Sequence, residues 1–141
     1  MPLRGLPVEF GINFFKVNAI SIVASTADLI TWVRIRWKDP RLMWDPLEFG
    51  NLTKTFMWIE SGSGGSESSQ IWTPDIYLWN HEEPMARTLS DTYATVHHTG
   101  IVRWSRPGRI KPSCKFEGLS RFPFDSLQCT LQFGSWTRNA Q

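Results

Sequence analysis

The segment CKFEGLSRFPFDSLQC occupies residues 114–129 and holds the only two cysteines of this 141-residue chain. Near its middle stand Phe122, Pro123, Phe124 and Asp125. The two rings are suited to burial, the proline fixes one backbone angle, and the carboxylate lies where the chain must turn. We expect this stretch to form a rigid turn that docks against a neighbouring surface.

Length and charge limit the class of protein. A chain of 141 residues suffices for one domain with a core, and is too short to expect two. Its net charge of +2 and scattered basic residues argue against nucleic acid or anionic lipid as a partner. The triplet Asn51-Leu52-Thr53 is an acceptor sequence for N-glycosylation. With the cysteines it favours an oxidising compartment; a pair of buried thiols in a cytosolic protein is the alternative.

The sequence offers little that points to a membrane span, a metal or catalysis. No run approaches the ~20 apolar residues that a membrane-spanning helix needs, and the start MPLRGLPVEFG lacks the apolar core of a secretion signal. The histidines have no metal-binding spacing, and no serine lies in a nucleophile elbow. We therefore expect a chain that neither spans nor enters a membrane, binds no cofactor or metal, and is not an enzyme.

Apolar and polar residues alternate at short range, and prolines or glycines interrupt them too often for long helices. This pattern predicts an all-β fold that starts with two long strands, residues 8–22 and 27–37, joined by a turn at 24–26. In the second strand the alternation separates an outward face from a core face. The outward face carries Trp32, Arg34 and Arg36, and the core face carries Val33, Ile35 and Trp37.

The remaining segments are shorter. Residues 39–52 predict an irregular connection with one helical turn, whose aromatic residues pack into the core. The stretch at 60–70 has no apolar residue and is rich in Gly and Ser, which predicts a mobile surface loop with a strand on each side. Residues 93–96 and 101–105 are expected to pair through a turn at 97–100. A last strand at 128–133 would place Cys129, Leu131 and Phe133 on one face.

The cysteine segment resembles the signature loop of Cys-loop receptors, the pentameric neurotransmitter-gated channels. In that family a disulfide closes the loop, which contacts the membrane domain and passes on the binding signal. Family loops hold thirteen residues between the cysteines, whereas fourteen lie between them here. Other blocks of the chain resemble the family in the family's order: 37–42, 44–46 with 49–50, 71–80, 100–107 and 133–137. The resemblance covers residues 8–137.

The resemblance implies an immunoglobulin-like β-sandwich, the extracellular ligand-binding domain of a receptor subunit, here partial over residues 1–141 and incomplete at both ends. Relative to the family, the N-terminal helix, the strands after Trp136 and the transmembrane helices are missing. The implied partners are a small-molecule agonist, the other subunits of a pentamer, and the transmembrane domain of the parent chain. The implied location is the extracellular side of the plasma membrane. A secreted protein similar to the soluble acetylcholine-binding proteins, and a nonfunctional truncated product, are the alternatives.

In this family the agonist binds between two subunits, in a box of aromatic rings that attract an ammonium group. The resemblance assigns Trp136, together with Trp79 or Tyr77, to one subunit's face, and Trp32 to the face of its neighbour. The alternative is that these rings belong to the core. Neighbouring positions on the second face are assigned to Thr95, Arg103 and Ser105.

Arg34 lies two residues after Trp32 and so leaves the strand on the same side. In the glycine and GABA receptor branches an arginine at the matching position receives the agonist's carboxylate. The alternative for Arg34 is a solvated residue paired with an acid. Because the 122–125 turn and the stretch 134–137 look more like the nicotinic and serotonin branches, the resemblance does not single out an agonist.

For gating, the resemblance assigns the contacts with the channel domain to Phe122, Phe124 and Asp125, around Pro123. The alternative is a buried turn that only closes the sandwich. In the family, the turn between the first two strands usually presents a polar, often acidic tip to the membrane domain. Residues 21–26 carry no charge here.

Overall fold

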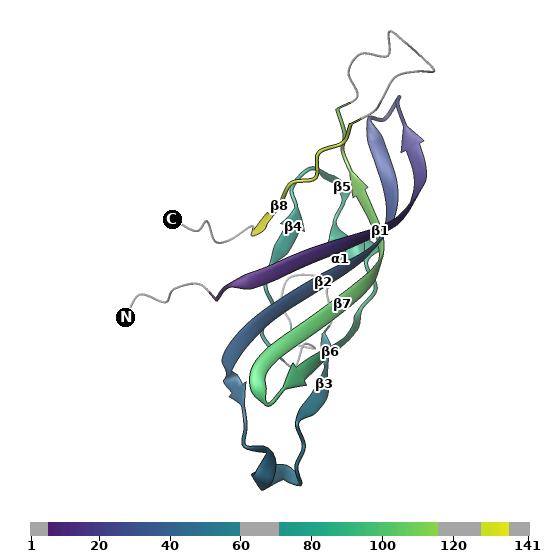
Figure 1. Cartoon of the computed structure of the whole chain (residues 1–141). Helices are drawn as coiled ribbons and strands as arrows, with labels where there is room; N and C mark the ends of the chain where they lie inside the picture. Colours follow the sequence, from purple (N-terminus) through teal and green to yellow (C-terminus); the bar gives the residue numbers. More distant parts are fainter. Residues whose placement is uncertain (1–5, 60–70, 116–127, 136–141) are drawn as a thin grey trace.

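A computed structural model describes residues 6–59, 71–115 and 128–135, and Figure 1 shows their arrangement. The elements in chain order are β1 (Val8–Ser21), β2 (Thr26–Met43), η1 (Pro46–Phe49), β3 (Lys54–Ile59), β4 (Ile76–Leu78), β5 (His81–Glu83), α1 (Met85–Thr88), β6 (Thr92–His97), β7 (Thr99–Pro112) and β8 (Phe133–Ser135). The all-β prediction is confirmed. Within the described ranges, neither of the two four-residue helices is long and apolar enough to cross a bilayer.

The strands form two antiparallel sheets. The larger sheet has the order β1-β2-β7-β6-β3, with β5 added on β7, and the smaller one pairs β4 with β8. In Figure 1 the long strands β1, β2 and β7 run side by side across the molecule. The rings of Phe10 on β1 and Phe133 on β8 lie 4.6 Å apart, centroid to centroid, so the two sheets pack on each other as a sandwich.

The first hairpin confirms the prediction closely. β1 and β2 pair from Val8 opposite Trp37 to Ser21 opposite Thr26, and residues 22–25 form the turn. The core face of β2 is also as predicted: Val33, Ile35 and Trp37 are all buried.

The predicted end of β2 is wrong, because the strand continues to Met43. Between Lys38 and Met43 the pairing of β2 with β7 is interrupted. Pro40, which has no backbone N–H to donate to a neighbouring strand, is tolerated in this unpaired stretch. The expected helical turn is present as η1, where the Asp45 carboxylate accepts a hydrogen bond from Leu47 N at 3.0 Å. The expectation that the aromatics of 39–52 pack into the core holds for Trp44 and fails for Phe49, which is exposed.

The hairpin of β6 and β7 is present, with a tighter turn than expected, since only His98 separates the two strands. Gly100 adopts a φ of 87°, and a Cβ there would lie 2.6 Å from the Asp39 carbonyl oxygen. Any larger residue at this position would therefore force the β7 backbone away from β2.

The prediction of a last strand at 128–133 is wrong in its bounds, because β8 begins only at Phe133. Among the described residues its strand partner is β4, which has three residues and pairs with Phe133 to Ser135. The predicted alternation is nevertheless found: Leu131 and Phe133 pack against the core, and their neighbours Thr130 and Gln132 are exposed.

The loop prediction at 60–70 lies outside the described residues. A strand, β3, precedes this stretch as expected. The expected strand directly after it is absent: residues 71–75 are irregular up to the start of β4, and Pro74 has no N–H for a ladder.

Asp39 is a buried acid in the interrupted part of β2. Its carboxylate accepts hydrogen bonds from Arg41 N at 3.0 Å, Nε at 2.9 Å and a terminal guanidinium nitrogen at 2.7 Å. Hydrogen bonding from the Arg41 side chain is the largest effect on the Asp39 pKa and lowers it below its usual value. The ion pair therefore stabilises the fold only while Asp39 is ionised.

We predict that Asp39→Asn lowers the free energy of unfolding at pH 7 by about 1 kcal/mol, the upper end for an ion pair whose arginine is largely exposed to solvent. Because the folded-state pKa lies below the unfolded one, this stability is present above about pH 4 and is lost as pH falls through the folded pKa. Urea unfolding at several pH values measures it. Arg41→Gln should also reduce the loss of unfolding free energy at acid pH. If neither variant changes the dependence of unfolding free energy on pH, the Asp39–Arg41 ion pair is not its source.

Candidate functional site

The outer face of the larger sheet carries a ring and a cation in contact. Trp32 and Arg34 leave β2 on the side opposite to the buried Val33, and the Arg34 guanidinium carbon lies 4.3 Å from the Trp32 ring centroid. The Phe15 ring stacks on Trp32 at 6.3 Å, with the planes inclined by 23°. Trp32 is partly exposed, so its ring belongs to the outer face and not to the core.

Strands β6 and β7 extend this face. Ser105 stands opposite Arg34, and Thr95 stands opposite Arg103. The structure thus brings Arg34, Ser105, Arg103 and Thr95 onto one surface, and their role in a ligand site stays a prediction. Among the described residues no ion pair joins Arg34 to an acid, and at the next outward position of β2 Arg36 pairs with Glu9 at 2.8 Å.

The second predicted set of rings belongs to the smaller sheet. Tyr77 and Trp79 are 38% and 53% exposed and flank Leu78, which is buried. They line a small hollow of about 180 Å³, to which His81 also contributes. The Trp79 ring covers Gly134, where a Cβ would lie 2.8 Å from its Cζ2 atom.

The two sets of rings lie on opposite outer faces of the sandwich. Val33, between Trp32 and Arg34, and Leu78, next to Tyr77 and Trp79, belong to the same buried core. Side chains that alternate with core residues in two facing sheets point away from each other. One small molecule therefore cannot contact both sets within a single chain.

A larger cavity, of about 320 Å³, lies elsewhere. Its apolar lining comes from the end of β2, η1, β3 and β6. None of the residues that the sequence predicted for ligand recognition takes part in it, so it is not the site predicted above.

The two cysteines form a disulfide, with 4.9 Å between the Cα atoms of Cys114 and Cys129. This confirms the disulfide and excludes the alternative of two free thiols. Cys114 N also donates a hydrogen bond to the Ser25 carbonyl oxygen at 2.7 Å. The disulfide is thereby joined to the tip of the β1–β2 hairpin.

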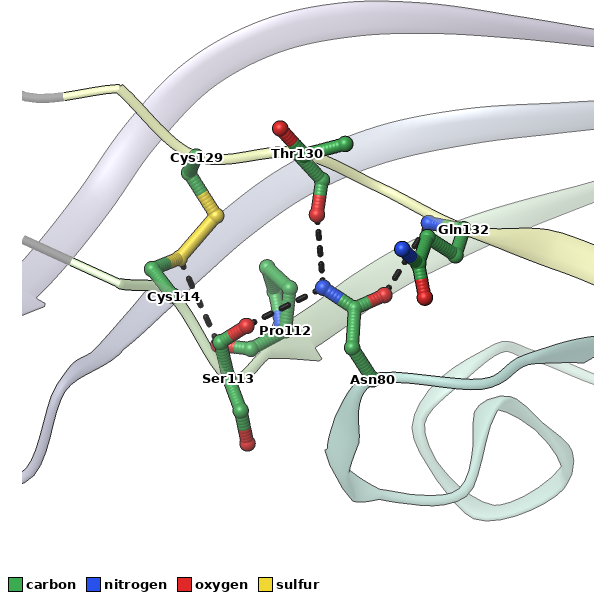
Figure 2. The surroundings of a disulfide bond; sticks show 7 residues. All are labelled: Asn80, Pro112, Ser113, Cys114, Cys129, Thr130 and Gln132. Atoms are coloured by element: carbon green, nitrogen blue, oxygen red, sulfur yellow. Dashed lines mark hydrogen bonds between the residues drawn. A yellow bond between two sulfur atoms is a disulfide. The ribbon is translucent and has the colours of Figure 1, made fainter.

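Asn80 is a residue that the sequence analysis did not single out. Its side chain hydrogen-bonds to the backbone of Ser113, Thr130 and Gln132, around the disulfide (Figure 2). These partners are 33, 50 and 52 residues away in the sequence, so no local pattern could have revealed them.

Arg106 was also missed. It is a buried cation on the inner face of β7, donates hydrogen bonds to the carbonyl oxygens of Leu89 and Ser90, and lies 3.6 Å from Asp91. Burial lowers the Arg106 pKa to about 10. The alternation along β7 could have found it, because it places a charge on the face of Val102 and Trp104.

Two groups of predicted residues remain untested. Asn51 lies in an exposed turn after η1 with a φ of 63°, an accessible position for the predicted glycosylation. The residues predicted to contact the channel domain, Phe122, Pro123, Phe124 and Asp125, lie outside the described residues, as does Trp136.

The chain folds as an antiparallel β-sandwich with a Cys114–Cys129 disulfide, and the comparisons with known proteins give its family. Residues 2–141 match the model of the neurotransmitter-gated ion-channel ligand binding domain. The chain therefore belongs to this family, the Cys-loop receptor ligand-binding domains. The matched relatives are receptor subunits and not enzymes.

Among the relatives is the acetylcholine receptor subunit alpha-L1 of Schistocerca gregaria, 32% identical over 92% of this chain and 22% of the relative. The neuronal acetylcholine receptor subunit alpha-2 of Mus musculus is 33% identical over 92% of this chain and 23% of its own length. The acetylcholine receptor subunit alpha-type unc-38 of Caenorhabditis elegans is 30% identical over 96% of this chain and 25% of its own length. The chain thus spans about a quarter of the length of these relatives.

We predict that replacing Cys114 and Cys129 together by alanine lowers the free energy of unfolding by about 3 kcal/mol, because the bond closes a loop of this length in the unfolded chain. Guanidinium chloride unfolding measures the loss. Reduction of the unaltered protein should shift the midpoint equally. A loss below about 1 kcal/mol would show that the bond adds little constraint.

Proposed function

We propose that this domain is the agonist-binding part of a pentameric ligand-gated ion-channel subunit, with the agonist held between two subunits. The observation that carries the proposal is the placement of Trp32 and Arg34 on one outer face and of Tyr77 and Trp79 on the other. A core separates the two sets, so a second subunit is needed to bring them together. The relatives are named as acetylcholine receptor subunits, which supports a role as a receptor subunit.

The chemistry of the two faces suits a small polar agonist. The exposed rings of Tyr77 and Trp79 offer electron-rich surfaces to an ammonium group. The family resemblance adds Trp136 to the candidates. On the facing subunit, Arg34 already lies over the Trp32 ring and competes there with a ligand cation. The guanidinium is a donor for a carboxylate or carbonyl group of the agonist, and Arg103 and Ser105 add donors beside it.

The proposed output is a shift of the disulfide-closed loop against the transmembrane domain of the complete receptor, at the extracellular side of the plasma membrane. The hydrogen bond from Cys114 N to Ser25 supports a role for the hairpin tip in this step. Phe122, Phe124 and Asp125 are the proposed contacts of the loop. The assembled receptor would then have two conformations, and agonist binding would shift the equilibrium toward the one in which the channel is open.

We predict that Trp32→Ala in the full-length subunit weakens agonist binding on the order of tenfold, because the ring faces the ligand and also holds the Arg34 guanidinium at 4.3 Å. Radioligand displacement with acetylcholine, tetramethylammonium and γ-aminobutyrate measures it. Trp58→Ala is the matched control, because Trp58 stands on edge strand β3 of the same sheet, with β7 and β6 between it and β2. Equal effects of the two substitutions would remove Trp32 from the site.

We predict that Arg34→Gln lowers the affinity for a carboxylate-bearing agonist by about tenfold or more and does not weaken binding of tetramethylammonium, because only the former uses the guanidinium. Displacement curves for the two probes give the ratio. Arg36→Gln is the control, since the Arg36 guanidinium pairs with Glu9. If Arg34→Gln altered both affinities equally, the assigned role of Arg34 would be wrong.

A further inference from the structure

The Asn80 side chain connects three separate backbone segments. Its Nδ2 group donates to the carbonyl oxygens of Ser113 at 3.0 Å and Thr130 at 2.6 Å, and its Oδ1 accepts from Gln132 N at 3.0 Å. Figure 2 shows the amide between these groups, beside the disulfide. One half-buried side chain thus uses both donors and its acceptor on main-chain groups.

Two of these partners are the direct neighbours of the disulfide. Ser113 precedes Cys114, and Thr130 follows Cys129. The Asn80 amide therefore joins the same two chain segments that the covalent bond joins, one residue further from it. Because residues 128–132 form no ladder, this amide takes the place of strand pairing there.

Asn80 is equally close to the proposed ligand rings. It follows Trp79 directly, and Trp79 N donates to the Gln132 carbonyl oxygen at 2.7 Å. Gln132 is therefore hydrogen-bonded on both sides, through its carbonyl to Trp79 and through its N–H to Asn80. On the far side of the disulfide, Cys114 N bonds to Ser25 in the hairpin tip. A continuous set of contacts runs from the Trp79 segment to that tip.

Asparagine has the chemistry that this position requires. Aspartate has the same shape, but its second oxygen would face two carbonyl oxygens and offer them no donor. Alanine and serine lack the reach for all three partners, and glutamine is one methylene longer. The side chain is therefore specified by its three partners together.

We propose that Asn80 is a positioning residue that holds the ring-bearing segment at 77–79 in fixed register with the Cys114–Cys129 disulfide, so that displacement of one is transmitted to the other. The geometric part of this inference stands on the hydrogen bonds alone. The use of the link for signalling rests on the proposed function.

The first test uses no ligand. Amide hydrogen exchange is measured for peptides 76–81 and 128–132 in the full chain, with and without Asn80→Asp, and with and without replacement of Cys114 and Cys129 by alanine. With Asn80 present, removal of the disulfide should speed exchange in 76–81 by about three- to tenfold, the range of one net hydrogen bond. With Asn80→Asp, exchange in 76–81 should already be faster, and removal of the disulfide should add little more.

The matched control is Asn18→Asp, the same chemical change on exposed β1, where the amide bonds to Asp28. It should leave the effect of the disulfide on 76–81 intact. If Asn80→Asp does not fold, Asn80→Ser takes its place, and chemical reduction of the disulfide takes the place of the two cysteine replacements. An equal effect of the disulfide with and without Asn80, or no effect of reduction on 76–81, would overturn the inference.

The signalling part has its own readout in the assembled receptor. Asn80→Asp should lower the maximal current, measured at saturating agonist, by about tenfold, and by a larger factor than any rise in the agonist Kd that comes from the loosened ring segment. Parallel loss of current and affinity would show that Asn80 acts on binding alone and would overturn transmission. If no agonist binds at all, the proposed function fails, whereas the exchange measurement still decides the geometric link.

Discussion

Along β2, buried and outward side chains alternate without a break from Thr31 to Lys38, and this alternation fixes what the rest of the molecule can do. It commits Val33, Ile35 and Trp37 to the core and leaves Trp32 and Arg34 on the surface. Because side chains alternate strictly along a strand, a shift of the pairing register by one residue would move every side chain of β2 to the opposite face of the sheet. The surface that we propose for recognition is thus set by the packing that stabilises the sandwich. In the proposed function, a second surface from outside the chain completes the site.

The opposite end of the domain is organised by a different constraint. Where β4 and β8 pair over three residues only, the chain around Cys129 has no ladder to hold it. The disulfide and the Asn80 amide supply the missing connections, one covalent and one through hydrogen bonds. This junction lies between the proposed ligand rings and the β1–β2 tip. The same connections that stabilise the fold there are the ones that we propose as a route for displacement.

Much of the fold could be predicted because its signals are local. The alternation of β2 gave the first hairpin and the core face, and the spacing of the two cysteines within a family-like segment gave the disulfide. The errors occurred where a partner strand decided the outcome. β2 continued past Trp37 because its interrupted pairing tolerates Pro40, and the last strand began late because β4 is short. Phe49 is exposed because η1 places it on the surface, which composition did not indicate.

The sequence by itself determined the all-β class, the family and the two sets of candidate rings, because periodicity and motif order are written in neighbouring residues. The tertiary structure decided that these rings lie on opposite faces, that Arg34 contacts Trp32, and that Arg106 is buried. It alone revealed Asn80, whose partners are 33 to 52 residues away. Contacts of that separation depend on how the sheets pack, and a hydrogen-bonding side chain carries no local signal of the distant backbone it will meet.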